Sequence, residues 1–116
     1  MNIKSFTDLE QSKKLSGILP LDSADHCFLN DGTAVKAEIN SYNVALQLWK
    51  DHYVEIIPAW SLAALLNVLP ESYQLTSNKE GKVQLMLIHQ LEMDYYDNPV
   101  DAVVDMIFKL KELNLL

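Results

Sequence analysis

The feature that most constrains this chain is an apolar run with a proline at each end, from Pro58 to Pro70. Proline is tolerated in the first turn of a helix but cannot continue one, so the run predicts a short helix that stops before Pro70. Ser61 is an alternative start, because its hydroxyl could cap the following turn. The run is shorter than the roughly 20 apolar residues of a membrane span, so we expect a core helix. Helical spacing places four leucines on one face: Leu62, Leu65, Leu66 and Leu69.

Two further helices are expected, one near each end of the chain. A helix over about residues 7–17 begins with a capping box formed by Thr7 and Glu10. The last helix begins at Pro99, with Asp97 or Asn98 as its cap. The predicted buried stripe of this last helix consists of Val100, Val103, Val104, Ile107, Leu110 and Leu113.

Alternating apolar residues predict strands between these helices. Four strands precede the central run, over residues 26–29, 33–38, 42–49 and 52–57, and Asn30-Asp31-Gly32 forms a turn between the first two. Residues 34–48 would also suit a helix, so the choice there stays open. Two more strands, over 71–77 and 82–90, follow the run. We therefore predict one α+β domain over residues 1–116, in the order αββββαββα. In it, an antiparallel sheet of about six strands packs against three helices in two layers.

The charge balance bears on the class of partner. Nine lysines face sixteen acids, which gives a net charge of −7, and the chain has no arginine. An acidic surface without arginine disfavours binding to nucleic acid or to an anionic membrane, although solubility alone explains such a surface. A single cysteine, Cys27, and an N-terminus without an apolar signal segment favour a cytoplasmic setting.

Two stretches carry a resemblance: Pro58-Ala59-Trp60-Ser61-Leu62-Ala63-Ala64-Leu65-Leu66-Asn67-Val68-Leu69-Pro70, and Asn98-Pro99-Val100-Asp101-Ala102 with the helix that follows it. Together with Glu10-Gln11-Ser12-Lys13-Lys14-Leu15, they resemble a group of small uncharacterised bacterial and phage-borne proteins. The resemblance covers the three helices, under half of the chain. It implies a bacterial setting and carries no functional residue across.

Signals for a metal ion, a cofactor or catalysis are weak. His26 and Cys27 are adjacent, so a strand would point them to opposite faces, and we expect Cys27 to be a small buried apolar residue. Ser61 lacks the G-x-S-x-G setting of a hydrolase nucleophile, and no glycine-rich phosphate loop is present. We therefore predict no catalytic, cofactor or metal site. The potential metal ligands weighed are Asp22, Asp25, His26, Cys27, His52 and His89.

The acids and aromatics near the last helix suggest a function. Trp49, Tyr95, Tyr96 and Asp97 form a candidate partner surface, since amphipathic aromatics anchor protein interfaces. The leading hypothesis is a non-enzymatic acidic protein that binds another protein or a second copy of itself, in a phage-associated accessory or regulatory role. A second hypothesis is a small metal-assisted hydrolase, and a third is an acidic nucleic-acid mimic that binds a basic protein. The hydrolase would draw on the acidic cluster Glu92, Asp94, Asp97, Asp101 and Asp105, with His89.

Overall fold

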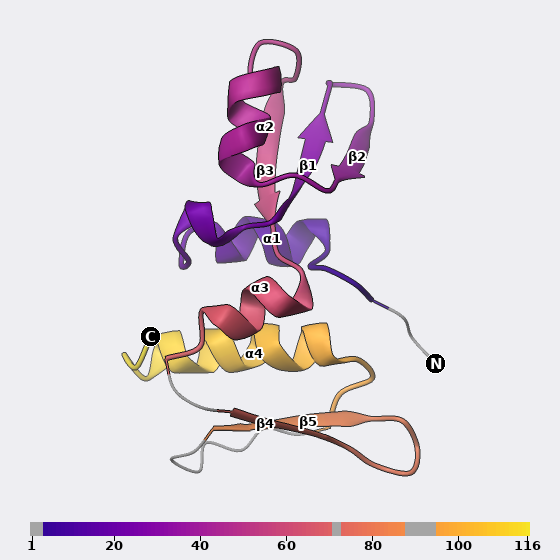
Figure 1. The fold of residues 1–116 in the computed structure, drawn as a ribbon, viewed down its shortest axis with the longest axis vertical. Helices are drawn as coiled ribbons and strands as arrows, with labels where there is room; N and C mark the ends of the chain where they lie inside the picture. Colours follow the sequence, from indigo (N-terminus) through magenta and orange to yellow (C-terminus); the bar gives the residue numbers. More distant parts are fainter. Residues whose placement is uncertain (1–3, 71–72, 88–94) are drawn as a thin grey trace.

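The computed structural model describes residues 4–70, 73–87 and 95–116, which form an α+β fold (Figure 1). The described helices are α1 (Leu9–Leu15), α2 (Tyr42–Trp49), α3 (Leu62–Asn67) and α4 (Pro99–Glu112), with a 3-10 turn, η1, at Leu21–Ser23. The described strands are β1 (His26–Asn30), β2 (Val35–Glu38), β3 (Glu55–Ala59), β4 (Tyr73–Ser77) and β5 (Val83–Leu87). The predicted α+β class is confirmed.

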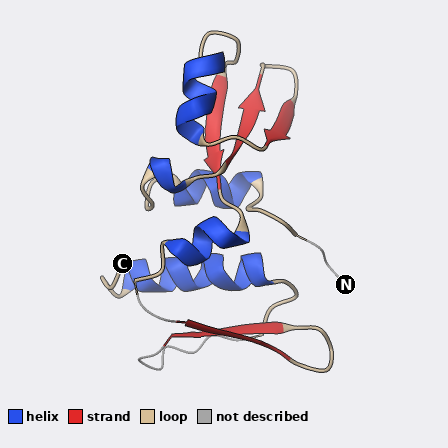
Figure 2. Ribbon diagram, in the orientation of Figure 1, coloured by secondary structure: helices blue, strands red, loops and turns tan. Residues whose placement is uncertain are grey.

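The strands form two separate sheets, so the prediction of one six-stranded sheet with three helices is wrong. One antiparallel sheet has the order β2-β1-β3 and the other pairs β4 with β5. Figure 2 shows the first sheet at one end of the molecule and the second at the other, with helices between them. We call β1, β2, β3 and α2 (residues 26–59) the upper lobe, and α3, β4, β5 and α4 the lower lobe. Helix α1 lies between the lobes (Figure 1).

Each lobe has its own core, and the two cores differ greatly in size. The lower core contains thirteen buried apolar residues, including Leu15 of α1, Trp60, and seven residues of α4. The upper core has three buried residues, Cys27, Leu29 and Ala45, with a few half-buried neighbours. Because the cores are stacked end to end, the chain is elongated. It measures 45 × 32 × 19 Å with a radius of gyration of 15.0 Å, against about 13 Å for a compact chain of this length.

Residues 42–49 form a helix, so the predicted strand there is wrong and the alternative left open is correct. The Ser41 hydroxyl caps α2 by accepting the N–H of Val44 at 3.2 Å. Ala45 points into the upper core and Trp49, one turn later, packs against it. The alternation of Val44, Leu46 and Leu48 suggested a strand. In the helix, Val44 and Leu48 share one face, where both are exposed, and Leu46 lies on a different side.

The central helix starts later than Pro58. Pro58 and Ala59 continue β3, where Pro58 lies opposite Cys27 of β1. This position is on an edge strand, where a missing N–H is tolerated. Helix α3 then starts at Ser61, whose hydroxyl accepts the N–H of Ala64, so the alternative start is the correct one. Leu62, Leu65 and Leu66 form the predicted face, with Leu65 fully buried and the other two half-buried. Leu69 packs against the same core but lies beyond the end of the helix.

The two outer helices follow the prediction with local corrections. The capping box of α1 consists of Asp8 and Gln11, one residue later than the predicted Thr7 and Glu10. Asn98 caps α4, and the predicted stripe is buried except for Leu113, which lies beyond the helix and is 46 % exposed. The end of the predicted strand 82–90 falls outside the described residues. With 14 residues, α4 is the longest described helix, and within the described ranges no helix could cross a bilayer.

The cap of α2 gives a direct test of the helix at residues 42–49. Replacing a serine N-cap with alanine costs about 1 kcal/mol, so Ser41→Ala is expected to lower the free energy of unfolding of the upper lobe by that amount. Amide hydrogen exchange within α2 should accelerate accordingly. Ser77→Ala, at the exposed end of β4, is the control and should leave α2 unchanged. Unchanged exchange in Ser41→Ala would contradict the cap.

Candidate functional site

The four residues of the predicted partner surface lie in different lobes. Trp49 ends α2 in the upper lobe, half-buried, and its ring meets Tyr53 edge to face at 6.5 Å between centroids. Tyr96 lies in the lower lobe, where its backbone pairs with Val83 at the start of β5. Tyr95 beside it is exposed, and Asp97 forms an ion pair with Lys82 at 3.2 Å. The structure therefore brings Tyr95, Tyr96 and Asp97 together and separates Trp49 from them.

The described acids of the proposed hydrolase cluster, Asp97, Asp101 and Asp105, have different surroundings. Asp97 pairs with Lys82 and Asp101 pairs with Lys4, so two of them face different lysines. Asp105 is half-buried one turn further along α4. His89, Glu92 and Asp94 lie outside the described residues. Among the residues that are described, no group of three His, Cys, Asp or Glu side chains could hold a metal ion.

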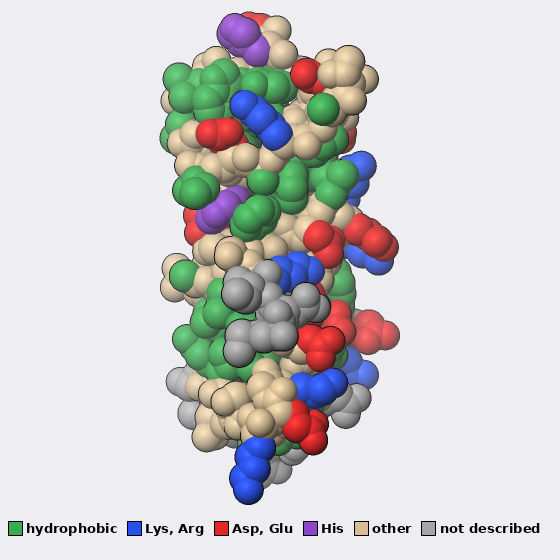
Figure 3. All heavy atoms as spheres, turned by 90° about the vertical axis from the view of Figure 1, so that its right-hand side faces the viewer, with side chains coloured by type: hydrophobic (Ala, Val, Ile, Leu, Met, Phe, Trp, Pro, Cys, Tyr) green, Lys and Arg blue, Asp and Glu red, His purple; other side chains and the backbone are tan. Residues whose placement is uncertain are grey.

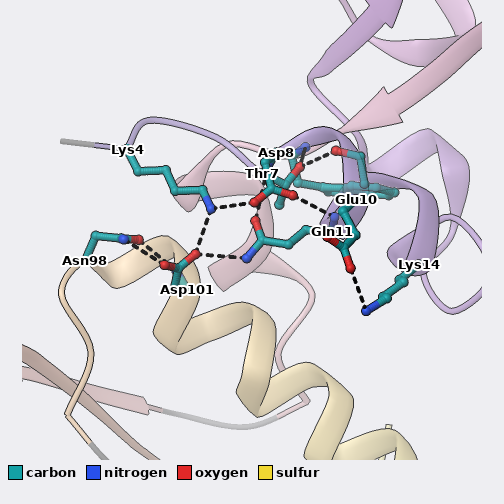
Figure 4. A network of polar contacts seen from close by, with 10 residues as sticks. Lys4, Thr7, Asp8, Glu10, Gln11, Lys14, Asn98 and Asp101 are labelled. Carbon is teal, nitrogen blue, oxygen red and sulfur yellow. Dashed lines mark hydrogen bonds and ion pairs between the residues drawn. The ribbon is translucent and has the colours of Figure 1, made fainter. Parts of the chain in front are cut away.

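Asp101 instead lies at the centre of a polar network between α4 and the N-terminal segment (Figure 4). Its Oδ1 receives the Lys4 ammonium at 2.8 Å and the Gln11 amide at 2.9 Å. Its Oδ2 accepts a hydrogen bond from the Asn98 side chain at 2.9 Å. The Lys4 ammonium also reaches Asp8 at 3.0 Å, so one lysine joins the cap of α1 to the first turn of α4. The sequence pattern of α4 could not reveal this network, because Lys4 is 97 residues away from Asp101 along the chain.

Opposing effects set the ionisation of this network. Burial raises the pKa of the Asp101 carboxyl, but hydrogen bonds from Lys4, Gln11 and Asn98 outweigh it and leave the pKa below its usual value. For Lys4, burial acts to lower the pKa, but the two aspartates it touches raise it overall. Both groups are therefore charged at neutral pH and stabilise the contact between α1 and α4.

A second set of bonds holds the N-terminal segment to the joint between the lobes. Thr7 is fully buried, and its backbone N–H donates to the Trp60 carbonyl at 2.9 Å. The Trp60 N–H donates in return to the Thr7 hydroxyl at 3.1 Å, and that hydroxyl also contacts the Ser12 hydroxyl at 2.7 Å. The Trp60 indole N–H donates to the Ser23 hydroxyl at 2.9 Å. Trp60 is thus fixed between β3 and α3 by polar as well as apolar contacts.

Asp25, His26 and Ser61 are the residue types of a serine hydrolase, but their arrangement differs from one. The Asp25 carboxylate accepts both the Ser61 hydroxyl and the Ser61 N–H, and it also contacts His26 Nδ1 at 3.1 Å. The carboxylate therefore lies between the serine and the histidine, whereas a catalytic serine needs the histidine as its base. The His26 ring stacks on Phe6 at 4.9 Å. This cluster connects the start of β1 to the cap of α3.

Cys27 is buried against α2, and its neighbour His26 points to the other face of the sheet, as the sequence predicted. Burial, followed by the negative charge of Glu38, raises the pKa of the Cys27 thiol to about 11. The thiol is therefore protonated and unreactive at neutral pH. Its role is to fill the small upper core.

The exposed apolar side chains of the upper lobe form the feature that the sequence missed. Of the eleven large hydrophobic residues that are exposed in the described chain, five lie between residues 35 and 54. Figure 3 shows hydrophobic surface over much of the upper lobe on the face drawn. These five residues are Val35, Ile39, Val44, Leu48 and Val54. The repeat of Val44 and Leu48 at a spacing of four would have pointed to an apolar helix face, had residues 42–49 been taken as a helix.

A shallow groove of about 390 Å³ lies at the end of α2, lined by Leu46, Gln47, Leu48, Lys50, Asp51 and His52. A second groove of about 410 Å³ is formed largely by Ile18, Pro20, Val68, Pro70 and Leu116 in the lower half of the molecule. Both grooves are open. The first places two leucines beside polar and charged side chains, whereas the second is largely apolar. No protein-family model, curated protein sequence or solved structure matches the chain.

The Asp101 network predicts sensitivity to acid. A carboxylate whose pKa is lowered on folding contributes stability above its unfolded pKa, and this contribution is lost as pH falls through the folded value. Asp8, Asp25 and Asp101 all have lowered pKa values, so the free energy of unfolding should decrease below about pH 4. Asp101→Asn should cost about 1 kcal/mol at pH 7 and flatten the acid decrease. Asp105→Asn, the same change one turn later, should preserve the decrease in urea titrations. An unaltered acid decrease in Asp101→Asn would contradict the network.

The buried thiol predicts chemical protection of Cys27. Raising the pKa from 9.0 to about 11 reduces the thiolate fraction about a hundredfold at neutral pH, and burial blocks access as well. A disulfide reagent should therefore modify the folded protein at least about a hundred times more slowly than the protein in urea. Comparable rates in the two states would show that Cys27 is accessible.

Proposed function

We propose that this protein acts by binding another protein through the outward side of α2, rather than by catalysing a reaction. The observation that carries the proposal is the imbalance of the upper lobe. Its core cluster contains three buried side chains, and Ile57 and Ala59 of β3 are the other buried apolar residues, while five large apolar side chains face solvent. Exposed apolar surface on so small a lobe has a cost in water, which a bound partner would remove.

The outward side of α2 is the part of this surface best suited to a partner. Val44 and Leu48 are one helical turn apart, so their side chains lie next to each other. Leu48, which is 55 % exposed, also borders the groove that contains Lys50 and His52. An apolar pair beside a groove with a few polar groups fits an apolar segment of another protein.

The lower lobe and the setting of the protein also belong to this proposal. Tyr95 and Asp97 offer a second, separate contact surface on the lower lobe, which a large partner could also reach. A bacterial or phage-borne setting, an accessory role and a cytoplasmic location rest on the resemblance of the helical segments and on the composition. Several surface acids form ion pairs with lysines, as Glu10 does with Lys14 and Asp97 with Lys82. Such mixed charge supports a protein interface better than a mimic of the phosphate backbone, which is uniformly negative.

Site-specific photocrosslinking tests the proposal. A photoreactive amino acid at position 48 is expected to give a discrete adduct with one partner in cells that naturally produce the protein. The same amino acid at position 79, in the exposed loop after β4, should give none. Val44→Glu should remove the adduct at position 48, because a charge would then face the apolar partner. Equal labelling at positions 48 and 79, or an adduct at position 48 that persists in Val44→Glu, would exclude the outward side of α2 as the binding surface.

A further inference from the structure

Strand β2 is an edge of the upper sheet and has no strand beyond it in the described structure. The sheet order β2-β1-β3 leaves one side of β2 open, and Figure 1 shows it as the outermost strand of the upper lobe. Residues Val35, Lys36 and Ala37 are all exposed, and Ile39, directly after the strand, is 80 % exposed. An open edge exposes backbone N–H and C=O groups that another strand can pair with.

The turn before β2 determines which residues present these backbone groups. The Asp31 N–H donates to the Ala34 carbonyl at 3.3 Å and closes a two-residue turn. In an antiparallel pair, hydrogen-bonded positions recur at every second residue, so Lys36 and Glu38 bond toward β1, opposite Leu29 and Cys27. The backbone groups of Val35 and Ala37 then point away from β1, toward the open edge.

The side chains of this edge are self-complementary in one register. If two β2 strands pair antiparallel about a two-fold axis at Ala37, Lys36 lies opposite Glu38 of the other copy, and Val35 lies opposite Ile39. Ala37 and its copy then form a hydrogen-bonded pair, which suits the outward direction of their backbone groups. The lysine and the acid occupy non-hydrogen-bonded positions, where facing side chains are closest.

We propose that a second copy of this chain pairs with β2 in this register and joins the two upper sheets into one six-stranded sheet. The two-fold axis runs through the sheet, so both α2 helices lie on the same face of it. The apolar side chains of Val35 and Ile39 cover each other on the opposite face, which also carries Phe28. A lone lysine on an edge strand usually discourages pairing, but here the facing Glu38 neutralises it. This interface is distinct from the outward side of α2 and does not depend on it.

The paired segment is short, so the interface is smaller than that of a permanent dimer and association should depend on concentration. Sedimentation velocity at physiological salt is expected to show the mass rising from 13.2 kDa toward twice that value with concentration. Ala37→Pro removes an outward N–H without disturbing β1, a change that edge strands tolerate, and should abolish the rise. A single 13.2 kDa species at every concentration would overturn the proposal.

Charge exchange tests the register itself. Lys36→Glu and Glu38→Lys each place like charges opposite one another across the axis, so each alone should weaken association about tenfold or more. A mixture of the two variants should associate again, because every acid in the mixed pair faces a lysine. Rescue on mixing also shows that both variants are folded. Lys79→Glu makes the same charge change away from β2 and should dimerise normally. If the substitutions leave association unchanged, or if mixing the two variants does not restore it, this register is refuted.

Discussion

The reciprocal bonds between Thr7 and Trp60 are the constraint on which the rest of the structure depends. Trp60 occupies the joint between the two lobes, where the chain leaves β3 and enters α3. Both its backbone N–H and its carbonyl would be buried without partners if Thr7 were elsewhere, and each unpaired group would cost about 1–3 kcal/mol. If the N-terminal segment detached, the Trp60 backbone groups would therefore either become exposed to water or stay buried without hydrogen-bond partners. This dependence explains how two cores of very different size remain aligned.

Two polar clusters flank this joint, and one of them links β1 of the upper lobe to the cap of α3 in the lower lobe. Below the joint, Lys4 and Gln11 hold the first turn of α4 through Asp101. Above it, Asp25 fixes the cap of α3 and the ring of Phe6 stacks on His26. Each cluster joins residues far apart in the sequence, and each is half-buried, so its hydrogen bonds are stronger than those of fully solvated pairs. Asp101 and Asp25, two of the acids that the sequence had suggested as metal or catalytic groups, therefore hold helix ends in place.

Local signals in the sequence predicted much of the fold. The cap at Asn98, the leucine face of α3 and the turn at Asn30-Asp31-Gly32 depend on neighbours within a few residues, and all three are present. The division into two sheets depends on which strands meet over long distances, and no local pattern contains that information. A strand was preferred over the helical alternative at residues 42–49 because an apolar residue at every second position fits a strand, although the same segment holds helical i, i+4 pairs. The exposed surface of the upper lobe was missed for the same reason.

The turn at Gly32 has a consequence for how such a chain can change over time. Gly32 has φ +93°, a backbone conformation that side-chain-bearing residues rarely adopt, and Asp31 accepts hydrogen bonds from the N–H groups of Thr33 and Ala34. Adding one residue to this turn would invert β2, sending Lys36 and Glu38 to the face now occupied by Val35 and Ala37. The same insertion would also exchange the β2 residues whose backbone N–H groups point to the open edge with those that bond to β1. The length of this one turn thus determines which backbone groups and side chains β2 presents at the open edge. An insertion or deletion of one residue here would let a related sequence gain or lose that edge.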